Sequence, residues 1–212
     1  MNIAGAIFDF DGTLFDSMPA WVGIRELFFS SIGIEMTEAD REFFRGKFTS
    51  EALPLAIDRF QLKMTYDALL DSFFAYLTQR YLDMAVPKND IIEFLEKLKA
   101  RGVKIGIATA SGEPAVKAAL EKFGMLDYFP VIYSTYTVGE SKLTPKVYDV
   151  VLNELGTDKE TTWVFEDALY AAKTAKENGY PVVGIYDPSE RRAEELQQLT
   201  DIYIHNYAEI AL

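Results

Sequence analysis

Short apolar runs alternate with amphipathic segments over most of the chain, a pattern typical of a parallel sheet covered by helices. Runs rich in β-branched and aromatic residues predict strands over Ile3–Phe8, Val103–Ala108, Val131–Ser134, Thr162–Phe165, Val182–Tyr186 and Ile202–Ile204. Helical spacing of apolar residues predicts helices over Asp90–Arg101, Pro114–Phe123, Pro145–Leu155, Ala168–Asn178 and Glu190–Leu199. Glycines that suit helix C-terminal ends follow at Gly102, Gly124, Gly156 and Gly179. The pattern predicts an α/β fold with a Rossmann-like parallel sheet.

Residues 17–86 interrupt this alternation directly after the first strand. They contain no convincing strand, and apolar residues recur at helical spacing over Ala20–Ser31, Glu38–Arg45, Ser50–Phe60 and Tyr66–Leu82. The many aromatic residues of this segment are expected to form a small core of its own. Prolines mark the two crossings, near Asp16–Pro19 and Met84–Lys88. We therefore expect an α/β core domain formed by residues 1–16 and 87–212, with residues 17–86 inserted as an all-helical cap.

Composition narrows the function classes. The chain has 212 residues, of which 49% are hydrophobic and 25% charged, as in a soluble globular protein. It has no apolar run that could span a membrane and no recognisable secretory signal, so a cytoplasmic location without a membrane partner is expected. A net charge of −12 argues against a nucleic-acid partner, which requires a basic surface. Because cysteine is absent and the single histidine, His205, lies far from every motif, catalysis has to use carboxylates, hydroxyls, lysines or a metal ion.

Two carboxylates, Asp9 and Asp11, follow the first predicted strand. Residues two apart in a strand face the same side, so both acids are expected at the strand's carboxyl end, before Gly12 turns the chain away. Such a pair can bind a divalent cation, and one of the two can act as a nucleophile. An EF-hand loop is excluded because alignment on Gly12 places Ile7 and Met18 where carboxylates are required. A solvated acidic turn would not explain the apolar run that precedes Asp9.

The next core strand ends at Thr109, which is followed by a turn of small residues, Ala110, Ser111 and Gly112. The Thr109 hydroxyl and the free backbone N–H groups of the turn, including that of Ala110, can hold one phosphate oxyanion. The same residues could equally form an ordinary helix N-cap, so this motif leaves both interpretations open.

Lys142 lies three residues before Pro145, where a helix is predicted to begin. A lysine at this place can neutralise charge on a phosphoryl group and on Asp9. Its neighbour Lys146 lies inside the helix and is expected to be solvated. Taken alone, either lysine could be a surface residue.

Glu166 and Asp167 follow another apolar strand. Adjacent strand residues point to opposite faces, so the two acids can serve one ion only if the strand ends there. Asp167 would then bind a cation directly, and Glu166 directly or through water. A helix N-cap is the alternative role for Asp167.

These four motifs, in this order, resemble motifs I to IV of the haloacid dehalogenase-like (HAD) superfamily, and the resemblance spans essentially the whole chain. The chain departs from the family pattern in its third and fourth motifs. Leu143 replaces the first proline of the Lys-Pro-x-Pro motif, and Ala168 and Ala171 replace a serine and a glycine of the last motif. The departures affect the start of a helix more than the acidic residues.

The resemblance implies a Mg²⁺-dependent phosphatase that forms an aspartyl-phosphate intermediate. Asp9 would be the nucleophile and Asp11 the general acid and base. Mg²⁺ would be bound by Asp9, the backbone carbonyl of Asp11 and Asp167. The resemblance further assigns phosphoryl binding to the second motif, through Thr109 and the backbone of Ala110, and to Lys142.

Within the superfamily, haloacid dehalogenases and phosphonoacetaldehyde hydrolases lack an acid at the position of Asp11. β-Phosphoglucomutases keep both acids and a similar cap, so a sugar phosphomutase is the alternative to a phosphoglycolate phosphatase-like enzyme. A non-catalytic binding protein of the same fold is a second alternative. The expected partner is a small phosphorylated metabolite, and the expected state is a monomer or weak homodimer. Arg45, Gly46 and Lys47 are candidate cap contacts for the substrate, or else an exposed basic turn.

Overall fold

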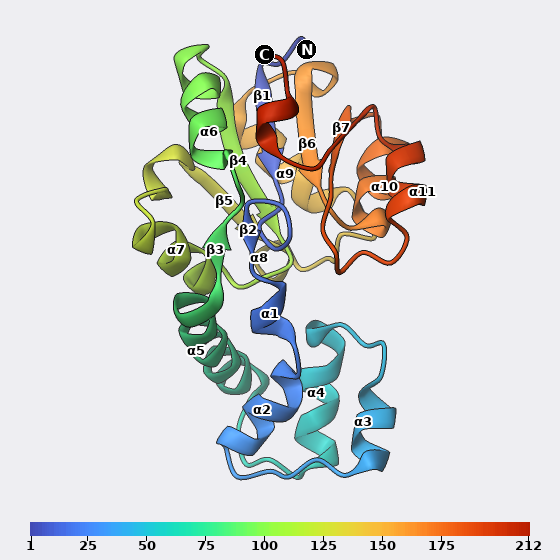
Figure 1. Cartoon of the computed structure of the whole chain (residues 1–212). Coiled ribbons are helices and arrows are strands. Elements are labelled where there is room, and N and C mark those ends of the chain that lie inside the picture. The colour runs from blue at the N-terminus through green and yellow to red at the C-terminus, as the bar shows by residue number, and fades with distance from the viewer.

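The computed structural model describes residues 1–212 and has a six-stranded parallel sheet at its centre (Figure 1). In sheet order the strands are β5 (Val131–Ser134), β4 (Lys104–Thr109), β1 (Gly5–Phe8), β6 (Thr162–Glu166), β7 (Val182–Ile185) and β8 (Ile202–Ile204). All neighbouring strands run parallel, which confirms the predicted α/β class. Because β1 lies between β4 and β6, the residues that follow these three strands meet at one edge of the sheet.

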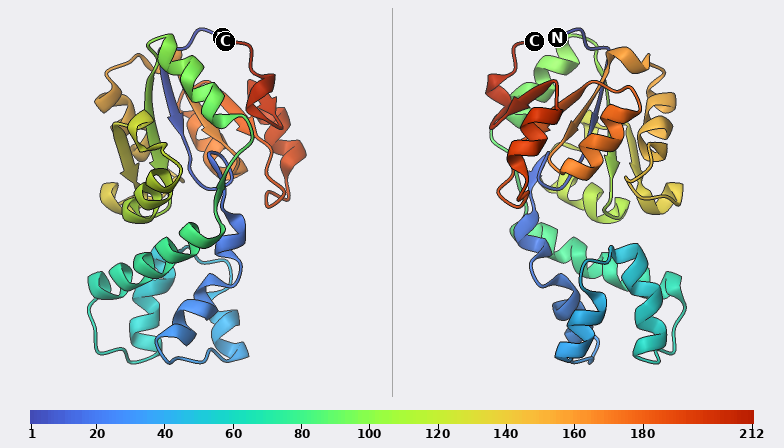
Figure 2. Two further views of the ribbon diagram at one scale, coloured as in Figure 1. Left: turned by 60° about the vertical axis from the view of Figure 1, so that its left-hand side comes forward. Right: turned by 90° about the vertical axis from the view of Figure 1, so that its right-hand side faces the viewer.

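Helices cover both faces of the sheet, as Figures 1 and 2 show. One face packs against α6 (Ile91–Ala100) and α7 (Glu113–Lys122), and the other against α9 (Lys146–Leu155), α10 (Leu169–Glu177) and α11 (Ala193–Leu199). Successive β1 residues alternate between the two cores: Ile7 belongs to one, Ala6 and Phe8 to the other. Both faces of the strand are buried, which explains its uninterrupted apolar sequence.

For the strands and longer helices of the α/β part of the chain, the predicted boundaries differ from the observed ones by a few residues at most. The four glycines expected to end helices all have positive φ. The short elements were not predicted: α8 (Thr135–Val138), η1 (Leu126–Tyr128), η2 (Lys159–Thr161) and η3 (Tyr207–Glu209). They are too short to show a period in the sequence. No helix has the length and apolar character that crossing a membrane requires.

The helices of residues 17–86 lie together beyond the carboxyl ends of the core strands (Figures 1 and 2). They are α1 (Met18–Trp21), α2 (Ile24–Ser31), α3 (Glu38–Phe44), α4 (Thr49–Arg59) and α5 (Tyr66–Met84). The continuous helix predicted over Ala20–Ser31 is wrong, because the chain is extended at Val22 and left-handed at Gly23, with φ of 62°. A glycine inside a helical pattern is commonly tolerated, so the sequence did not reveal this break.

The aromatic residues of this helical segment pack on one another, for example Phe28 on Phe73 with ring centroids 5.3 Å apart. Their cluster is continuous with the core under the sheet, through Phe10, Phe15 and Tyr81. The helical segment and the sheet therefore share one apolar core at the crossing, and the expectation of a separate core for the helical segment is wrong.

Two very short strands join the crossing segments. β2 (Phe15–Asp16) pairs antiparallel with β3 (Val86–Pro87). Lys88, just after β3, forms ion pairs with Asp16 at 3.0 Å and with the buried Asp187 at 2.8 Å. This ribbon was not predicted, since two residues carry no alternation.

Candidate active site

Three buried carboxylates meet where β1 and β6 end. Asp9 follows β1, Glu166 is the last residue of β6, and Asp167 follows it. One oxygen of each lies within 4.8 Å of the others, a spacing that suits ligands around one divalent cation. When ionised, three carboxylates with one neighbouring lysine carry an excess of negative charge, so the donor set fits such an ion. β6 ends at Glu166, which is the condition under which Glu166 and Asp167 can face one ion.

Lys142 lies against two of these carboxylates. Its side chain is 2% exposed and its ammonium forms ion pairs with Asp9 Oδ1 and, at 2.8 Å, with Glu166 Oε2. The Tyr148 hydroxyl of α9 donates to the same Glu166 oxygen at 3.1 Å. Lys146, by contrast, is half-exposed and pairs with Glu140 at 3.0 Å. The structure thus brings Lys142, and not Lys146, into the acidic cluster.

Burial has a strong effect on these acids. Burial and the neighbouring Glu166 raise the pKa of Asp9 to about 8, although the Lys142 ammonium opposes the shift. Burial together with Glu166 and Asp9 raises the pKa of Asp167 well above its usual range. A divalent cation among these oxygens would favour their charged forms, because it is the largest local charge in such a site.

One oxygen of Asp9 is left for chemistry. Lys142 occupies Oδ1, and Oδ2 accepts no hydrogen bond from the protein. Every fully buried polar side-chain atom of the protein has a hydrogen-bond partner. Asp9 Oδ2 has none, so it is not fully buried and reaches open space. Asp9 lines a cleft of about 370 Å³ together with the rest of the acidic cluster, Lys142 and Asp11.

The carboxylate of Asp11 lies outside the acidic cluster. It accepts hydrogen bonds from Ser17 at 2.6 Å and from the Trp21 indole at 2.9 Å. The hydroxyls of Tyr81 and Ser111 also donate to it. Asp9 and Asp11 therefore line one cleft but face different partners, so the two neighbouring acids are suited to different tasks.

The second motif contributes a turn to the cleft. Ala110 and Ser111 line it, whereas Thr109 is fully buried and its hydroxyl accepts the N–H of Ser111 at 2.9 Å. In this structure Thr109 shapes the turn, while Ala110 and Ser111 face the space next to Asp9 and Asp11.

The helical segment closes the cleft from the opposite side. Phe48, between α3 and α4, lines the cleft, and its ring centroid lies 5.8 Å from that of Tyr170 in α10. Trp21 and Met18 of α1 also line it. Residues from both sides of the crossing therefore enclose the acids.

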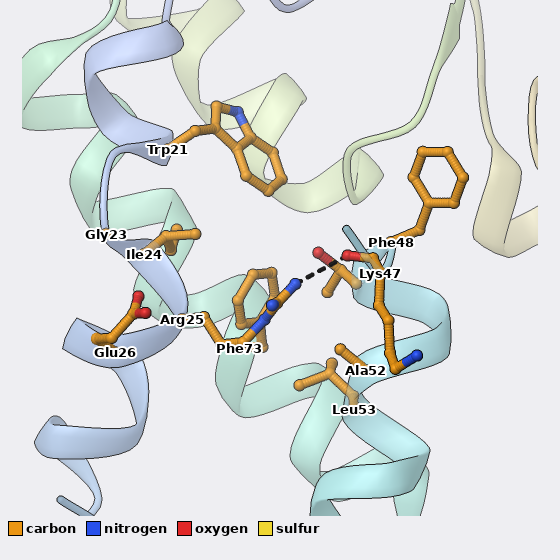
Figure 3. Close-up of a pocket in the computed structure, with 11 residues that line it drawn as sticks. Trp21, Gly23, Ile24, Arg25, Glu26, Lys47, Phe48, Ala52, Leu53 and Phe73 are labelled. Carbon is orange, nitrogen blue, oxygen red and sulfur yellow. Dashed lines mark hydrogen bonds between the residues drawn. The ribbon is translucent and has the colours of Figure 1, made fainter. Parts of the chain in front are cut away.

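A second cavity of about 380 Å³ lies among the cap helices and shares Trp21 and Phe48 with the cleft (Figure 3). Arg25 reaches across it from α2 and donates to the backbone carbonyl of Lys47 at 2.9 Å, as Figure 3 shows. Lys47 lines this cavity with Arg25 and Glu26, two cationic side chains and one anionic.

The three predicted cap contacts occupy different environments. Lys47 lines the cap cavity, but Arg45 and Gly46 line neither cavity. Arg45 is 70% exposed and pairs with Glu42 at 2.7 Å. Of the three predicted substrate contacts, Lys47 therefore lies where a bound leaving group could reach it, and Arg45 and Gly46 do not.

Sequence reasoning missed several residues of the site. Trp21, Phe48, Ser111 and Tyr170 line the cleft, and Tyr81 bonds to Asp11. Ser111 belongs to the second motif, so its position in the sequence was a signal that its hydroxyl is a candidate site group. The aromatic residues gave no signal, since aromatic side chains in amphipathic helices usually serve the core.

The fold and site together define a Rossmann-like domain with a carboxylate cluster at the ends of its central strands and helices over the opening. Residues 6–185 match the family model described as haloacid dehalogenase-like hydrolase, and the chain belongs to this family. This membership agrees with the four motifs and their order.

Several known proteins are similar over most of their length. A phosphorylated carbohydrates phosphatase of Thermotoga maritima is 25% identical over 82% of this chain and 80% of that protein. A phosphoglycolate phosphatase of Rhodospirillum rubrum is 26% identical over 84% of this chain and 77% of that protein. The crystal structure of CbbY from Rhodobacter sphaeroides in complex with phosphate has a TM-score of 0.81 at 22% identity, covering 98% of this chain and 96% of that chain. This last likeness shows a shared fold.

Proposed function

We propose that this chain is a Mg²⁺-dependent phosphatase that hydrolyses a small phosphorylated metabolite through an aspartyl-phosphate on Asp9. The observation that carries the proposal is the pairing of Lys142 with Asp9 and Glu166 inside a cluster of three buried carboxylates. Asp11 lines the same cleft. Family membership and the phosphatase names of the similar proteins support it.

The cation would be held by Asp9, Asp167 and Glu166, with the backbone carbonyl of Asp11 as a further candidate ligand. All of these donors are hard oxygens, which favour Mg²⁺ over softer metals. When bound, the cation supplies positive charge that offsets the charge of the phosphoryl group.

The reaction has two balanced steps. In the first, Asp9 Oδ2 attacks phosphorus, an Asp9–phosphorus bond forms, the bond to the leaving oxygen breaks, and Asp11 gives its proton to that oxygen. In the second, water attacks the phosphorus of the aspartyl-phosphate, Asp11 takes a proton from the water, and phosphate leaves with the Asp9 carboxylate restored. Lys142 stabilises negative charge on the phosphoryl oxygens in both steps.

The second motif would hold the phosphoryl group through backbone N–H groups of the turn at Ala110. The geometry supports a backbone role there, because Ala110 lines the cleft beside Asp9. The direct contact between Thr109 and phosphate stays a prediction. Its buried hydroxyl orients the N–H of Ser111 and so preforms the turn.

The leaving group would extend toward the cap cavity, because that cavity and the cleft share Trp21 and Phe48. Arg25 and Lys47 outnumber Glu26 there, which favours a leaving group with an anionic or strongly polar end. Phosphorylated sugars and short phosphorylated acids are therefore the first substrates to test.

The decisive experiment measures phosphate release from p-nitrophenyl phosphate and from a panel of such metabolites. Wild type is compared with Asp9→Asn, each with MgCl₂ or with EDTA. We expect Mg²⁺-dependent release by wild type and its loss in Asp9→Asn. Asp149→Asn is the matched control, because Asp149 bonds to Lys159 and Tyr180 away from the cleft and the variant should keep activity.

Three outcomes would contradict the proposal. No release from any substrate would favour a binding protein of the same fold. Interconversion of hexose phosphates without net release would favour a phosphomutase. Activity in Asp9→Asn equal to that of wild type would exclude Asp9 as the nucleophile, and mass spectrometry of quenched wild type would then show no phosphate on the peptide that contains Asp9.

A further inference from the structure

Four side chains converge on the carboxylate of Asp11. Oδ1 accepts from Ser17, Trp21 and Tyr81, and Oδ2 accepts from Ser111. Ser17 and Trp21 belong to the first crossing and α1, Tyr81 to α5, and Ser111 to the turn after β4. The donors therefore come from both sides of the crossing.

We call Trp21, Tyr81 and Ser111 around Asp11 the hydroxyl cluster, although Trp21 contributes an indole N–H. Tyr81 is its central member. Its hydroxyl donates to Asp11, accepts from the Trp21 indole at 3.0 Å, and lies 2.9 Å from the Ser111 hydroxyl. The ring is fully buried and lies at a tilt against the Phe10 ring, with centroids 5.4 Å apart. Tyr81 does not line the cleft, so its hydroxyl acts on Asp11 and not on a substrate.

The cluster depends on how α5 docks on the core. Gly112, at the start of α7, lies so close to Phe74 of α5 that a Cβ at Gly112 would be 2.6 Å from the Phe74 ring. The same Phe74 ring also meets Tyr136 of α8 edge-on, with centroids 4.8 Å apart. Movement of α5 away from the core would withdraw the Tyr81 hydroxyl from Asp11 and Ser111 together.

We propose that Tyr81 is a positioning residue that holds the Asp11 side chain in place and ties that position to the docking of α5. The inference rests on the proposed function, in which Asp11 exchanges protons with the leaving group and with water. A carboxylate can rotate about two side-chain bonds, and a displacement of about 1 Å can cost as much as ~100-fold in rate. Ser111 holds Asp11 from the core side and Ser17 from the first crossing, whereas Tyr81 and Trp21 hold it from the cap side.

Tyr81→Phe tests the proposal, because it removes the hydroxyl and keeps the buried ring. We expect kcat for an alkyl phosphate to fall about 10- to 100-fold with KM changed less than about two-fold, since Tyr81 touches Asp11 and not the substrate. The rate of the first step should fall less for p-nitrophenyl phosphate than for the alkyl phosphate, because nitrophenolate leaves without needing a proton.

Tyr180→Phe is the matched control. Tyr180 is also buried and donates its hydroxyl to a carboxylate, Asp149, at 2.6 Å, but it lies outside the cleft. Tyr180→Phe should lower thermal stability as Tyr81→Phe does, because each variant loses a buried hydrogen bond. It should leave kcat and the leaving-group dependence of the rate unchanged. A Tyr81→Phe enzyme with wild-type kcat and leaving-group dependence would overturn the proposal, as would a loss confined to KM.

An NMR measurement that does not depend on catalysis tests the positioning role of Tyr81 separately from the proposed function. The protein has two tryptophans, and the indole N–H resonance of Trp21 can be assigned with Trp163→Phe. This resonance should shift in Tyr81→Phe and in Asp11→Asn but not in Tyr180→Phe. An unchanged resonance would show that the hydroxyl cluster does not form, whatever the activity, whereas absent wild-type activity with the expected shifts would refute the function and with it the positioning role.

Discussion

Gly12 and Asp167, 155 residues apart in sequence, lie so close that a Cβ on Gly12 would be 2.3 Å from Asp167 Oδ2. Gly12 also has a φ of +77°, which side-chain-bearing residues rarely adopt. The turn after β1 and the acid after β6 therefore fit together only with glycine at position 12.

Gly12→Ala should lower metal affinity and activity. The methyl group must displace the Asp167 carboxylate, and the left-handed backbone adds about 1–2 kcal/mol of strain. We expect at least a roughly 10-fold weaker response to Mg²⁺, measured by titrating activity and thermal stability.

Gly124→Ala is the control for the backbone effect, because Gly124 has a φ of +67° and no atom within 4 Å of an added Cβ. It should lower stability similarly and leave the Mg²⁺ response intact. Equal Mg²⁺ responses in the two variants would refute the contact with Asp167.

Lys142→Met should destabilise the protein and remove activity. Asp9 and Glu166 would lose their buried counter-charge, and breaking such a buried pair typically costs about 3–5 kcal/mol. The free energy of unfolding can be measured by urea denaturation, and activity should fall at least about 100-fold. Lys146→Met, which removes an exposed ion pair with Glu140, should change stability by less than about 1 kcal/mol. Similar losses in both variants would contradict the distinction between the two lysines.

Lys47→Ala should raise KM for substrates whose leaving group is anionic, by about 5- to 10-fold, because one charge contact in a partly open cavity is worth about 1 kcal/mol. KM for p-nitrophenyl phosphate should change little. Arg45→Ala serves as the control, since Arg45 lines neither cavity. A larger effect in Arg45→Ala would place the substrate on the exposed turn instead.

The ion pair between Lys88 and Asp187 predicts a pH-dependent contribution to stability. Burial opposes the charged form of Asp187, but hydrogen bonds from Lys88 and Ser189 outweigh it and lower its pKa. A lowered carboxyl pKa stabilises the folded state above the unfolded pKa of about 4, and this contribution is lost as the pH falls below that value. The pKa of Lys88 is raised, because its bonds to Asp187 and Asp16 outweigh burial, so its contribution persists until strongly alkaline pH.

Lys88→Met should therefore lower the free energy of unfolding by about 1–3 kcal/mol near neutral pH, with the deficit shrinking below about pH 4. Urea denaturation of both proteins across this range measures it. Lys97→Met, which removes an exposed pair with Glu93 at 2.8 Å, should show a much smaller deficit. A Lys88→Met deficit that grows as the pH falls would contradict the proposed coupling.

Local sequence determined the strands, the helices and the residues that follow each strand. The alternation of apolar runs and the glycines after helices are short-range signals, because each depends on neighbouring backbone geometry. They identified Asp9 and Asp167 as candidates without the fold, whereas Lys142 was a candidate through its place before Pro145 and the family resemblance. Local patterns did not predict the ribbon of β2 and β3 or the short helix α8, because so few residues show no period. They did not predict the break at Gly23 because a glycine inside a helical pattern is commonly tolerated.

The tertiary structure alone decided how these candidates face one another. The strand order, with β1 between β4 and β6, brings Asp9 to Glu166, and the loop before α9 inserts Lys142 between them. Asp11 meets partners 70 and 100 residues away, Tyr81 and Ser111, in an orientation that no local pattern encodes. A side chain that leaves a strand end has several available directions, and the direction it takes depends on hydrogen-bond partners that other elements deliver only after the chain has folded.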